Sequence, residues 1–327
     1  FVINDDQLRQ RLSEKFGAQY FFETSSSSGI RRALSAGVWF TSAGLPVYGT
    51  GLSRNRMIVN LWHGVPLKKI ALLDPNLKKS SRLYFRKIFS ENYTCILTTS
   101  RSLVPLMAES FHVPENRIKV WGQPRNDNIF RRKNRKKLLD KIYPDLPEYS
   151  RVILYAPTFR DQGSVRLFPF PDFDQKLLEK YLEEKNMLLF IRTHIAERAS
   201  ARPFLGSRIR FLGEDEAGDV TGILDIFDCL ITDYSSIYID YLLTGNPIVF
   251  LPYDREEYLA GRGMNFDYDE VTPGPRPGTL KEFLDCLVPE NDCWKADRDR
   301  VNRLFNEVQK PCAGEICRHI LKKIRER

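Results

Sequence analysis

The sequence predicts an α/β protein in which two domains, each a parallel β-sheet flanked by helices, face one another across a cleft. Three observations support this fold class. The chain has 327 residues, which favours two domains of ordinary size over one. Short apolar runs alternate with helical patterns along most of the chain, as is typical of βαβ units. Polar clusters follow several of the predicted strands, where open α/β sheets place their ligand crevice.

Composition narrows the possible classes of protein. The hydrophobic fraction is 42%, which is enough for a packed core. No apolar run approaches the roughly 20 residues that a membrane-spanning helix needs. A net charge of +8 is compatible with nucleic acid, an anionic membrane or a phosphate-rich substrate as partner. No signal peptide is evident, and Phe1 in place of Met suggests a truncated chain or a domain cut from a longer protein.

The cysteines argue against a disulfide or zinc framework. None of the six forms a C-x-x-C pair, and several lie in apolar runs. We therefore expect reduced thiols in a cytosolic protein, most of which pack in the interior. With four histidines and no clustered Cys and His, a structural zinc site is not expected.

The first half of the chain begins with a predicted helix over residues 5–16, where Leu8, Leu12 and Phe16 have helical spacing. Apolar runs predict strands at 20–22, 38–40, 57–62, 95–99 and 118–121, with helices at 30–36 and 102–111.

A basic amphipathic segment lies over residues 77–89, within this first half. Its apolar residues are interspersed with the basic side chains of Lys78, Lys79, Arg82, Arg86 and Lys87. Such a segment can lie on an anionic membrane surface. The alternative is a solvated helix face that packs on its own domain.

A charged, proline-bearing stretch over 131–149 separates the two halves, and we expect domains at 1–140 and 141–327. The second half repeats the strand-and-helix alternation. Strands are predicted at 152–155, 187–191, 209–211, 225–231 and 247–251, and helices at 173–186, 220–224, 279–288 and 296–326.

The stretch from Ile231 to Leu243 carries the strongest polar cluster. Asp233, Ser235 and Ser236 lie where the predicted strand turns into a helix. Ser and Asp at such a corner can cap the helix. A helix N-terminus can equally bind an anion, and two serines at that position would form a phosphate-binding site. This stretch alone leaves both interpretations open.

Histidines and arginines occupy the other predicted strand ends. His63 could be a general base, or a histidine hydrogen-bonded to backbone. Arg192 and His194 offer donors to a diphosphate, or are structural. Arg125 and Arg160 could bind phosphate at the opening of the cleft, or they form surface ion pairs. Asp127, Thr158 and Thr232 lie at the same strand ends.

Several sequence motifs are absent. We find no phosphate-binding P-loop, no dinucleotide-binding G-x-G-x-x-G after a strand, no H-E-x-x-H and no G-x-S-x-G. Asp267 and Asp269 form a D-x-D, which is short and lies late in the chain. We therefore expect no metal site.

Six segments, in order, resemble the motifs of one family, the CDP-glycerol glycerophosphotransferases, which include teichoic-acid primases and polymerases. W-H-G-V-P-L-K at 62–68 resembles the family's W-H-G-T-P-L-K. The others are G-Q-P-R-N-D at 122–127, A-P-T-F-R at 156–160, R-T-H at 192–194, T-D-Y-S-S at 232–236 and D-Y-D-E-V-T-P-G-P at 267–275.

This resemblance implies a GT-B-like fold of two Rossmann-like domains and no required metal or other cofactor. It implies transfer of glycerol phosphate or ribitol phosphate from a CDP-alditol to a hydroxyl of a lipid-linked or growing polymer, with release of CMP. The setting would be bacterial teichoic-acid or capsule synthesis, for cell wall or capsule polymers. We then expect a peripheral enzyme on the cytoplasmic face of the cell membrane, with no nucleic acid as partner.

The resemblance also suggests roles for individual residues. His63 becomes the candidate base for the acceptor hydroxyl, and His194 the second candidate catalytic histidine. Donor phosphate contacts are expected from Arg160, His194, Ser235 and Ser236, within a donor site that also includes Arg125, Asp127, Thr158, Arg192, Thr232 and Asp233. Two alternatives stay open: a GT-B glycosyltransferase that uses a nucleotide sugar, and a non-catalytic domain of a larger polymerase.

Overall fold

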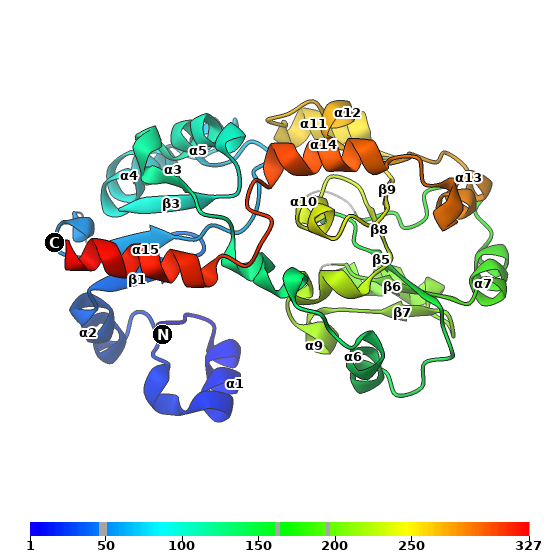
Figure 1. The fold of residues 1–327 in the computed structure, drawn as a ribbon, viewed down its shortest axis with the longest axis horizontal. Coiled ribbons are helices and arrows are strands. Elements are labelled where there is room, and N and C mark those ends of the chain that lie inside the picture. Colours follow the sequence, from blue (N-terminus) through cyan, green and yellow to red (C-terminus); the bar gives the residue numbers. More distant parts are fainter. Residues whose placement is uncertain (46–50, 161–163, 194–196, 327) are drawn as a thin grey trace.

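The computed structural model describes residues 1–45, 51–160, 164–193 and 197–326, with backbone only at residues 260 and 262. Two β-sheets form the centres of two lobes that lie side by side (Figure 1). Neighbouring strands in both sheets are parallel. No helix within the described ranges is long and apolar enough to cross a membrane.

The first sheet has the strand order β1-β2-β3-β4 and the second has the order β7-β6-β5-β8-β9. The strands are β1 (Val38–Thr41), β2 (Met57–Asn60), β3 (Cys95–Thr98), β4 (Ile118–Val120), β5 (Arg151–Tyr155), β6 (Met187–Ile191), β7 (Ile209–Phe211), β8 (Cys229–Thr232) and β9 (Ile248–Phe250).

The order of strands in the second sheet reverses beside β5. The chain adds β6 and β7 on one side of β5 and then returns to add β8 and β9 on the other side. In open α/β sheets, ligands bind outside the carboxyl ends of the strands at such a reversal. The fold therefore places a ligand crevice between the carboxyl ends of β5 and β8.

Helices cover both sheets. They are α1 (Asp6–Phe16), α2 (Ser27–Ser35), α3 (Lys79–Tyr84), α4 (Ser90–Asn92), α5 (Val104–Phe111), α6 (Arg135–Ile142), α7 (Gln175–Glu184), α8 (Arg198–Ala201), α9 (Glu214–Ala217), α10 (Ile237–Tyr241), α11 (Arg255–Arg262), α12 (Tyr268–Val271), α13 (Leu280–Cys286), α14 (Lys295–Phe305) and α15 (Ala313–Arg325).

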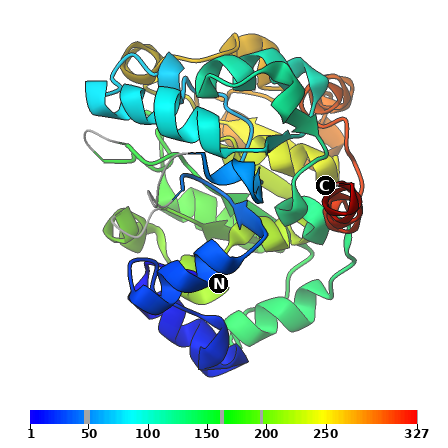
Figure 2. The same cartoon turned by 90° about the vertical axis from the view of Figure 1, so that its left-hand side faces the viewer.

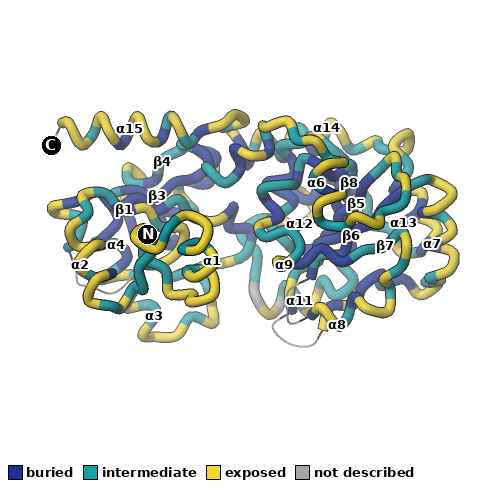
Figure 3. Tube along the Cα trace, turned by 90° about the horizontal axis from the view of Figure 1, so that it is seen from below, coloured by how far each residue is buried: buried dark blue, intermediate teal, exposed yellow. Residues whose placement is uncertain are grey.

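The C-terminal helix α15 covers one face of the first sheet. The strands connect in sequential order, and right-handed crossovers place the connecting helices on one face only. On the opposite face, Val59 and Leu97 pack against Ile316 and Ile320 of α15. Figure 3 shows α15 and α3 on opposite sides of β1 and β3. Although α15 falls in the expected domain 141–327, in space it completes the first lobe.

The single helix expected over 296–326 is wrong. Two helices, α14 and α15, are separated by residues 306–312, which cross from the second lobe to the first (Figure 1). Pro311 lies in this connection, and proline lacks the amide donor and clashes with the preceding helical turn. Figure 2 views α15, in red, along its axis.

Two other local expectations differ from the structure, and the basic segment has an unexpected feature. Residues 20–22 form no extended strand, and Phe22 makes only an isolated bridge with Val2. β8 begins at Cys229, because a 3-10 helix occupies Val220–Ile226. In the basic segment, α3 continues into a π-helical turn at Phe85–Phe89.

The second sheet is buried on both faces, as parallel sheets usually are. One face packs on α7 and α13, where Ile153 and Ile231 meet Leu182 and Phe283. The side chains of the opposite face, Leu154 among them, belong to a core cluster that continues into the first lobe. This continuous packing holds the two lobes, and the strand ends between them, in one arrangement.

Candidate active site

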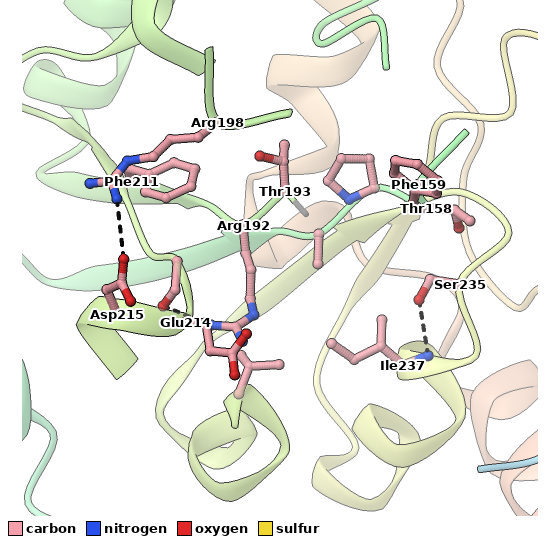
Figure 4. A pocket seen from close by; sticks show the side chains of 14 residues that line it. Thr158, Phe159, Arg192, Thr193, Arg198, Phe211, Glu214, Asp215, Ser235 and Ile237 are labelled. Atoms are coloured by element: carbon pink, nitrogen blue, oxygen red, sulfur yellow. Dashed lines mark hydrogen bonds and ion pairs between the residues drawn. The ribbon is translucent and has the colours of Figure 1, made fainter. Parts of the chain in front are cut away.

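The carboxyl ends of β5, β6 and β8 border a cavity of about 320 Å³ at the point where the strand order reverses. Thr158 lines it from the end of β5, Arg192 and Thr193 from the end of β6, and Ser235 from the turn after β8 (Figure 4). Glu214 closes it from α9. The structure therefore brings together side chains that the sequence places far apart.

Two threonine hydroxyls near this cavity have no partner among the described residues. The Oγ1 atoms of Thr158 and Thr193 are buried, and neither has a hydrogen-bond partner among the described residues. Buried polar groups are normally satisfied. Because both oxygens are shielded from solvent, a ligand could bond to them only after the surrounding side chains move.

Arg192 carries positive charge beside the cavity without a carboxylate in ion-pair contact among the described residues. Its guanidinium donates to the carbonyls of Leu212 (3.1 Å), Gly213 (3.1 Å) and Gly218 (2.6 Å). Burial lowers the pKa of Arg192, and nearby acidic groups offset this only in part. A half-buried guanidinium whose hydrogen bonds among the described residues go to neutral carbonyls can bind an anionic ligand, although Glu214 and Asp215 line the same cavity.

A second cavity of about 180 Å³ lies between the lobes. The turn that contains His63 lines one side of it, and Tyr234, Ser235 and Ser236 line the other. Ser235 borders both cavities, so they adjoin at this residue. A ligand can thus extend from the second lobe to His63 of the first lobe.

The helix-capping interpretation of the two serines has little support. Ser236 precedes α10 but its side chain caps no amide of the helix. Ser235 Oγ accepts from the amide of Ile237 at 3.4 Å, which is long for a hydrogen bond. Both hydroxyls remain able to bind a ligand.

His63 is held by an unusual turn at the end of β2. Trp62 has a left-handed φ of 56°, and the exposed imidazole of His63 lies tilted against the indole with ring centroids 4.1 Å apart. His63 Nδ1 lies 2.7 Å from the carbonyl oxygen of Ser42. A carbonyl can only accept, so Nδ1 carries the hydrogen and Nε2 of the neutral ring is the basic nitrogen.

Gly64 allows the lobes to approach each other next to His63. Its φ is 151°, in a region that favours glycine. A Cβ at this position would lie 3.3 Å from Arg125 Nη2 and 3.5 Å from Ser236 Oγ. A Cβ would therefore be tight against Arg125 and in ordinary contact with Ser236.

Arg160 and Asp233 lie at the strand ends, but they bond to each other. Arg160 Nη2 lies 2.8 Å from Asp233 Oδ2, and its Nε donates to Asp254 at 2.7 Å. Asp233 also accepts from the amides of Thr158 (2.8 Å) and Tyr234 (2.6 Å). Both side chains are buried, so they shape the strand ends around the cavity instead of pointing into it.

Arg125 joins the two lobes next to the second cavity. Its guanidinium forms an ion pair with Asp240 of α10, and Asn126 Nδ2 donates to the same carboxylate at 2.8 Å. Burial raises the pKa of Asp240, although the charge of Arg125 opposes this. The pair fixes α10 against the first lobe.

Asp127 and Thr232 have structural partners. Both oxygens of Asp127 accept backbone amides at the start of α15, from Cys312 (2.8 Å) and Ala313 (3.1 Å). The hydroxyl of Thr232 donates to the carbonyl of Ala156 at 2.7 Å, which ties β8 to β5. We therefore assign neither residue to phosphate binding.

His194 lies outside the described residues.

In the basic segment, Lys78, Lys79, Arg86 and Lys87 are exposed, together with Leu83, whose side chain is 62% exposed. Arg82 is different, because it donates to the carbonyls of Leu72 and Asp74. Four of the five expected basic side chains therefore face solvent.

The D-x-D pair has local partners. Asp267 caps α12 by accepting the amides of Asp269 (2.8 Å) and Glu270 (3.4 Å). Asp269 pairs with Arg255 at 2.8 Å. In the part of the chain that the structure describes, no group of three or more His, Cys, Asp or Glu side chains could hold a metal ion.

Sequence reasoning missed several residues that build the site. Asp254 follows the apolar strand β9. Its position could have marked it as another polar residue at the carboxyl end of a strand. Asn60 and Asp240 lie within apolar stretches, Tyr93 lies just before one, and none of the three gave such a signal. Their partners are distant in the chain and meet them only in the folded protein.

Both a family model and a solved structure match this chain. The family model of CDP-Glycerol:Poly(glycerophosphate) glycerophosphotransferase matches residues 5–322. A solved structure of the wall teichoic acid polymerase TagF superposes with a TM-score of 0.78 at 28% identity, covering 94% of this chain and 77% of that one. This match confirms the expected GT-B-like arrangement of two Rossmann-like domains.

Two curated relatives are similar over much of the chain. The teichoic acid ribitol-phosphate polymerase TarL of Staphylococcus aureus is 26% identical over 312 residues, covering 88% of this chain and 54% of the relative. The teichoic acid poly(glycerol phosphate) polymerase of Staphylococcus epidermidis is 32% identical over 251 residues, covering 72% of this chain and 34% of the relative. The chain thus spans about half the length of TarL, and less of the second relative.

Proposed function

Because the chain belongs to the CDP-glycerol:poly(glycerophosphate) glycerophosphotransferase family, we propose that it transfers an alditol phosphate from a CDP-alditol donor. The alditol is glycerol or ribitol, since the relatives include polymerases of both kinds. The acceptor is a hydroxyl of a lipid-linked or growing polymer, and CMP is released. The product belongs to teichoic-acid or capsule synthesis.

One observation carries this proposal: Ser235 borders both cavities. A CDP-alditol needs a nucleotide site on one lobe and room for the alditol phosphate next to the acceptor base. The larger cavity at the strand reversal suits the cytidine end. The smaller cavity, which His63 lines, suits the alditol phosphate. The diphosphate then passes Ser235 and Ser236, where hydroxyl groups can donate to its oxygens.

The transfer step follows from this placement. The oxygen of the acceptor hydroxyl attacks the phosphorus that bears the alditol, and its proton passes to Nε2 of His63. The bond from that phosphorus to the bridging oxygen of CMP breaks, and CMP leaves with the bonding electrons. A phosphodiester remains on the acceptor. Such a reaction depends on alignment of the nucleophile and on neutralised phosphate oxygens.

The protein's own cations supply charge for the donor phosphates in this proposal. Arg192 lies at the larger cavity, where its partners among the described residues are carbonyls, and Arg125 Nη2, which is paired with Asp240, lies close to Gly64 of the smaller one. Arg160 acts indirectly, since its bonds to Asp233 and Asp254 hold the strand ends in place. We propose that the reaction requires no metal ion or other cofactor.

We further propose that the enzyme is peripheral on the cytoplasmic face of the membrane. Lys78, Lys79, Arg86 and Lys87 are exposed beside exposed Leu83. Basic side chains around an apolar one are suited to a membrane with anionic lipids, and a lipid-linked acceptor is presented there.

A donor screen tests the proposal. Purified protein is incubated with a lipid-linked acceptor analogue and CDP-glycerol, CDP-ribitol or a UDP-sugar, and free nucleotide is measured. We expect CMP from a CDP-alditol, and about a tenfold rise in KM for the donor in Ser235→Ala, as for loss of one hydrogen bond to a charged group. Ser35→Ala, on the exposed end of α2, is the matched control.

Turnover of UDP-sugars alone would overturn the proposal in favour of a glycosyltransferase. Binding of CDP without turnover of any donor would favour a non-catalytic domain of a larger polymerase.

A further inference from the structure

The hydrogen bond between His63 and Ser42 is held from both sides by two buried side chains, Asn60 and Tyr93. We infer that Asn60 and Tyr93 are positioning residues, which keep the Ser42 carbonyl against Nδ1 of His63 and so leave Nε2 free as the base. The inference rests on the proposed function, in which His63 accepts the proton of the acceptor hydroxyl.

Asn60 binds the chain on both sides of the His63–Ser42 contact. Its Oδ1 accepts from the amide of Trp62 at 2.8 Å, one residue before His63. Its Nδ2 donates to the carbonyl of Ala43 at 3.0 Å, one residue after Ser42. Asn60 is 0% exposed, so its amide group is shielded from water. One side chain therefore sets the spacing between the two segments.

Tyr93 holds the same segment from the adjacent strand. Its hydroxyl donates to the carbonyl of Ala43 at 2.8 Å. The hydroxyl has one hydrogen, so it must accept at its 3.0 Å contact with Thr41 Oγ1, and Thr41 is the donor. Tyr93 is 0% exposed, and burial raises its pKa, which keeps the hydroxyl protonated as a donor. Thr41 and Ala43, on either side of Ser42, are thus both fixed.

His63 needs such support. Ser42, Ala43 and the imidazole are exposed at the lobe surface. Neutral imidazole in water favours hydrogen on Nε2, the tautomer that cannot take a proton there. A carbonyl held 2.7 Å from Nδ1 reverses this preference. Nε2 has no hydrogen-bond partner among the described residues, so it can face the acceptor.

The tautomer can be observed directly by NMR of protein labelled with ¹⁵N-histidine, at alkaline pH where the ring is neutral. The chain has four histidines, and loss of a signal in His63→Gln identifies that of His63. We expect Nδ1–H in the wild type and a shift toward Nε2–H in Tyr93→Phe and in Asn60→Ala.

Tyr241→Phe is the matched control, because it removes another fully buried phenol, which donates to the carbonyl of Phe227 at 2.8 Å in the second lobe. It should leave the His63 signal unchanged. Tyr93→Phe removes a single oxygen, so the test does not depend on whether Asn60→Ala folds. Melting temperature and circular dichroism establish folding of each variant.

In turnover assays we expect kcat to fall about tenfold or more in Tyr93→Phe, within the roughly 10²–10⁴-fold that a general base contributes. The KM for the CDP-alditol should change little, since neither residue lines a donor cavity. Nε2–H in the wild type, or an unchanged His63 signal in both variants, would overturn the inference. A tautomer shift in a protein that releases no CMP would support the positioning role and count against the proposed function instead.

Discussion

Arg160 and Asp233 form a buried ion pair at the carboxyl ends of β5 and β8, with Nη2 and Oδ2 2.8 Å apart and side-chain exposures of 6% and 2%. Burial alone would lower the pKa of Arg160, but the bond to Asp254 and the charge of Asp233 together raise it above its usual value. The pair joins the A-P-T-F-R motif at 156–160 to the T-D-Y-S-S motif at 232–236. Their shared role is to hold the strand ends around the larger cavity.

Asp233→Ala should therefore act on stability. Removing one partner leaves the buried charge of Arg160 undercompensated, and we expect the free energy of unfolding to fall by about 3–5 kcal/mol in urea titrations. Asp269→Ala is the control, because its pair with Arg255 is exposed and is worth at most about 1 kcal/mol. Equal, small effects of both changes would contradict a structural role for Asp233.

Asp127→Ala should loosen α15. Its carboxylate accepts two amides at the start of that helix, and loss of an N-terminal cap costs about 0.5–2 kcal/mol. Hydrogen exchange should become faster in α15 first, because the change is local. Affinity for CDP should stay the same, and a loss of CDP binding with α15 still protected would instead assign Asp127 to the donor site.

His63→Ala should abolish transfer without abolishing donor binding. We expect CMP release from the CDP-alditol to fall by about 10²–10⁴-fold, because the acceptor hydroxyl loses its base. CDP affinity, measured by calorimetry, should be kept, since His63 does not line the larger cavity. His194→Ala is expected to lower CMP release as well. CMP release unaffected by both changes would refute the mechanism.

The basic segment gives a prediction about membranes. Replacing Lys78, Lys79, Arg86 and Lys87 by Gln should weaken binding to vesicles of phosphatidylglycerol and phosphatidylcholine by up to roughly 10²–10³-fold, at about 1 kcal/mol per charge. The matched control replaces Lys176, Lys185, Lys281 and Arg303, which are exposed in the second lobe.

Vesicles without phosphatidylglycerol, and high salt, should remove the difference. Equal loss of binding in both quadruple variants would show a general effect of net charge and would argue against a specific membrane face.

Asp292 gives a prediction about pH. Its hydrogen bonds with Arg298 hold the pKa of Asp292 below the ordinary value of 3.8. A carboxyl with a depressed folded-state pKa stabilises the protein above its unfolded-state pKa, and this stability is lost as pH falls through the folded-state value. Asp292→Asn should thus cost about 2–3 kcal/mol at neutral pH.

Urea titrations of the wild type and Asp292→Asn, from neutral pH to below 3.8, check the sign. The difference between the two proteins should shrink as the pH falls. A difference that grows on acidification would mean that Asp292 is not stabilised as a carboxylate.

The strand pattern in the sequence was sufficient to predict where His63, Thr158, Arg192 and Ser235 would gather. Apolar runs predicted the strands, and parallel strands bring their carboxyl ends to one edge of a sheet. The local boundaries were less accurate, as at 296–326, because the hydrophobic pattern continues through Pro311.

The partners of the polar side chains could not be predicted. Asp127 meets Cys312 across 185 positions in the chain, and Arg125 meets Asp240 across 115. Spacing along a chain says nothing about such pairs. For this reason Asp127 and Arg160 looked like phosphate ligands in the sequence, whereas in the structure their bonds are to other parts of the protein.

By itself the sequence determined the fold class, the family resemblance and the set of polar residues at the strand ends, because these depend on local patterns of apolar and polar side chains. Only the tertiary structure decided which of those residues face a cavity, which lock the lobes together, and which nitrogen of His63 is free. Those properties depend on hydrogen bonds and ion pairs between distant segments, which form when packing brings the two lobes together.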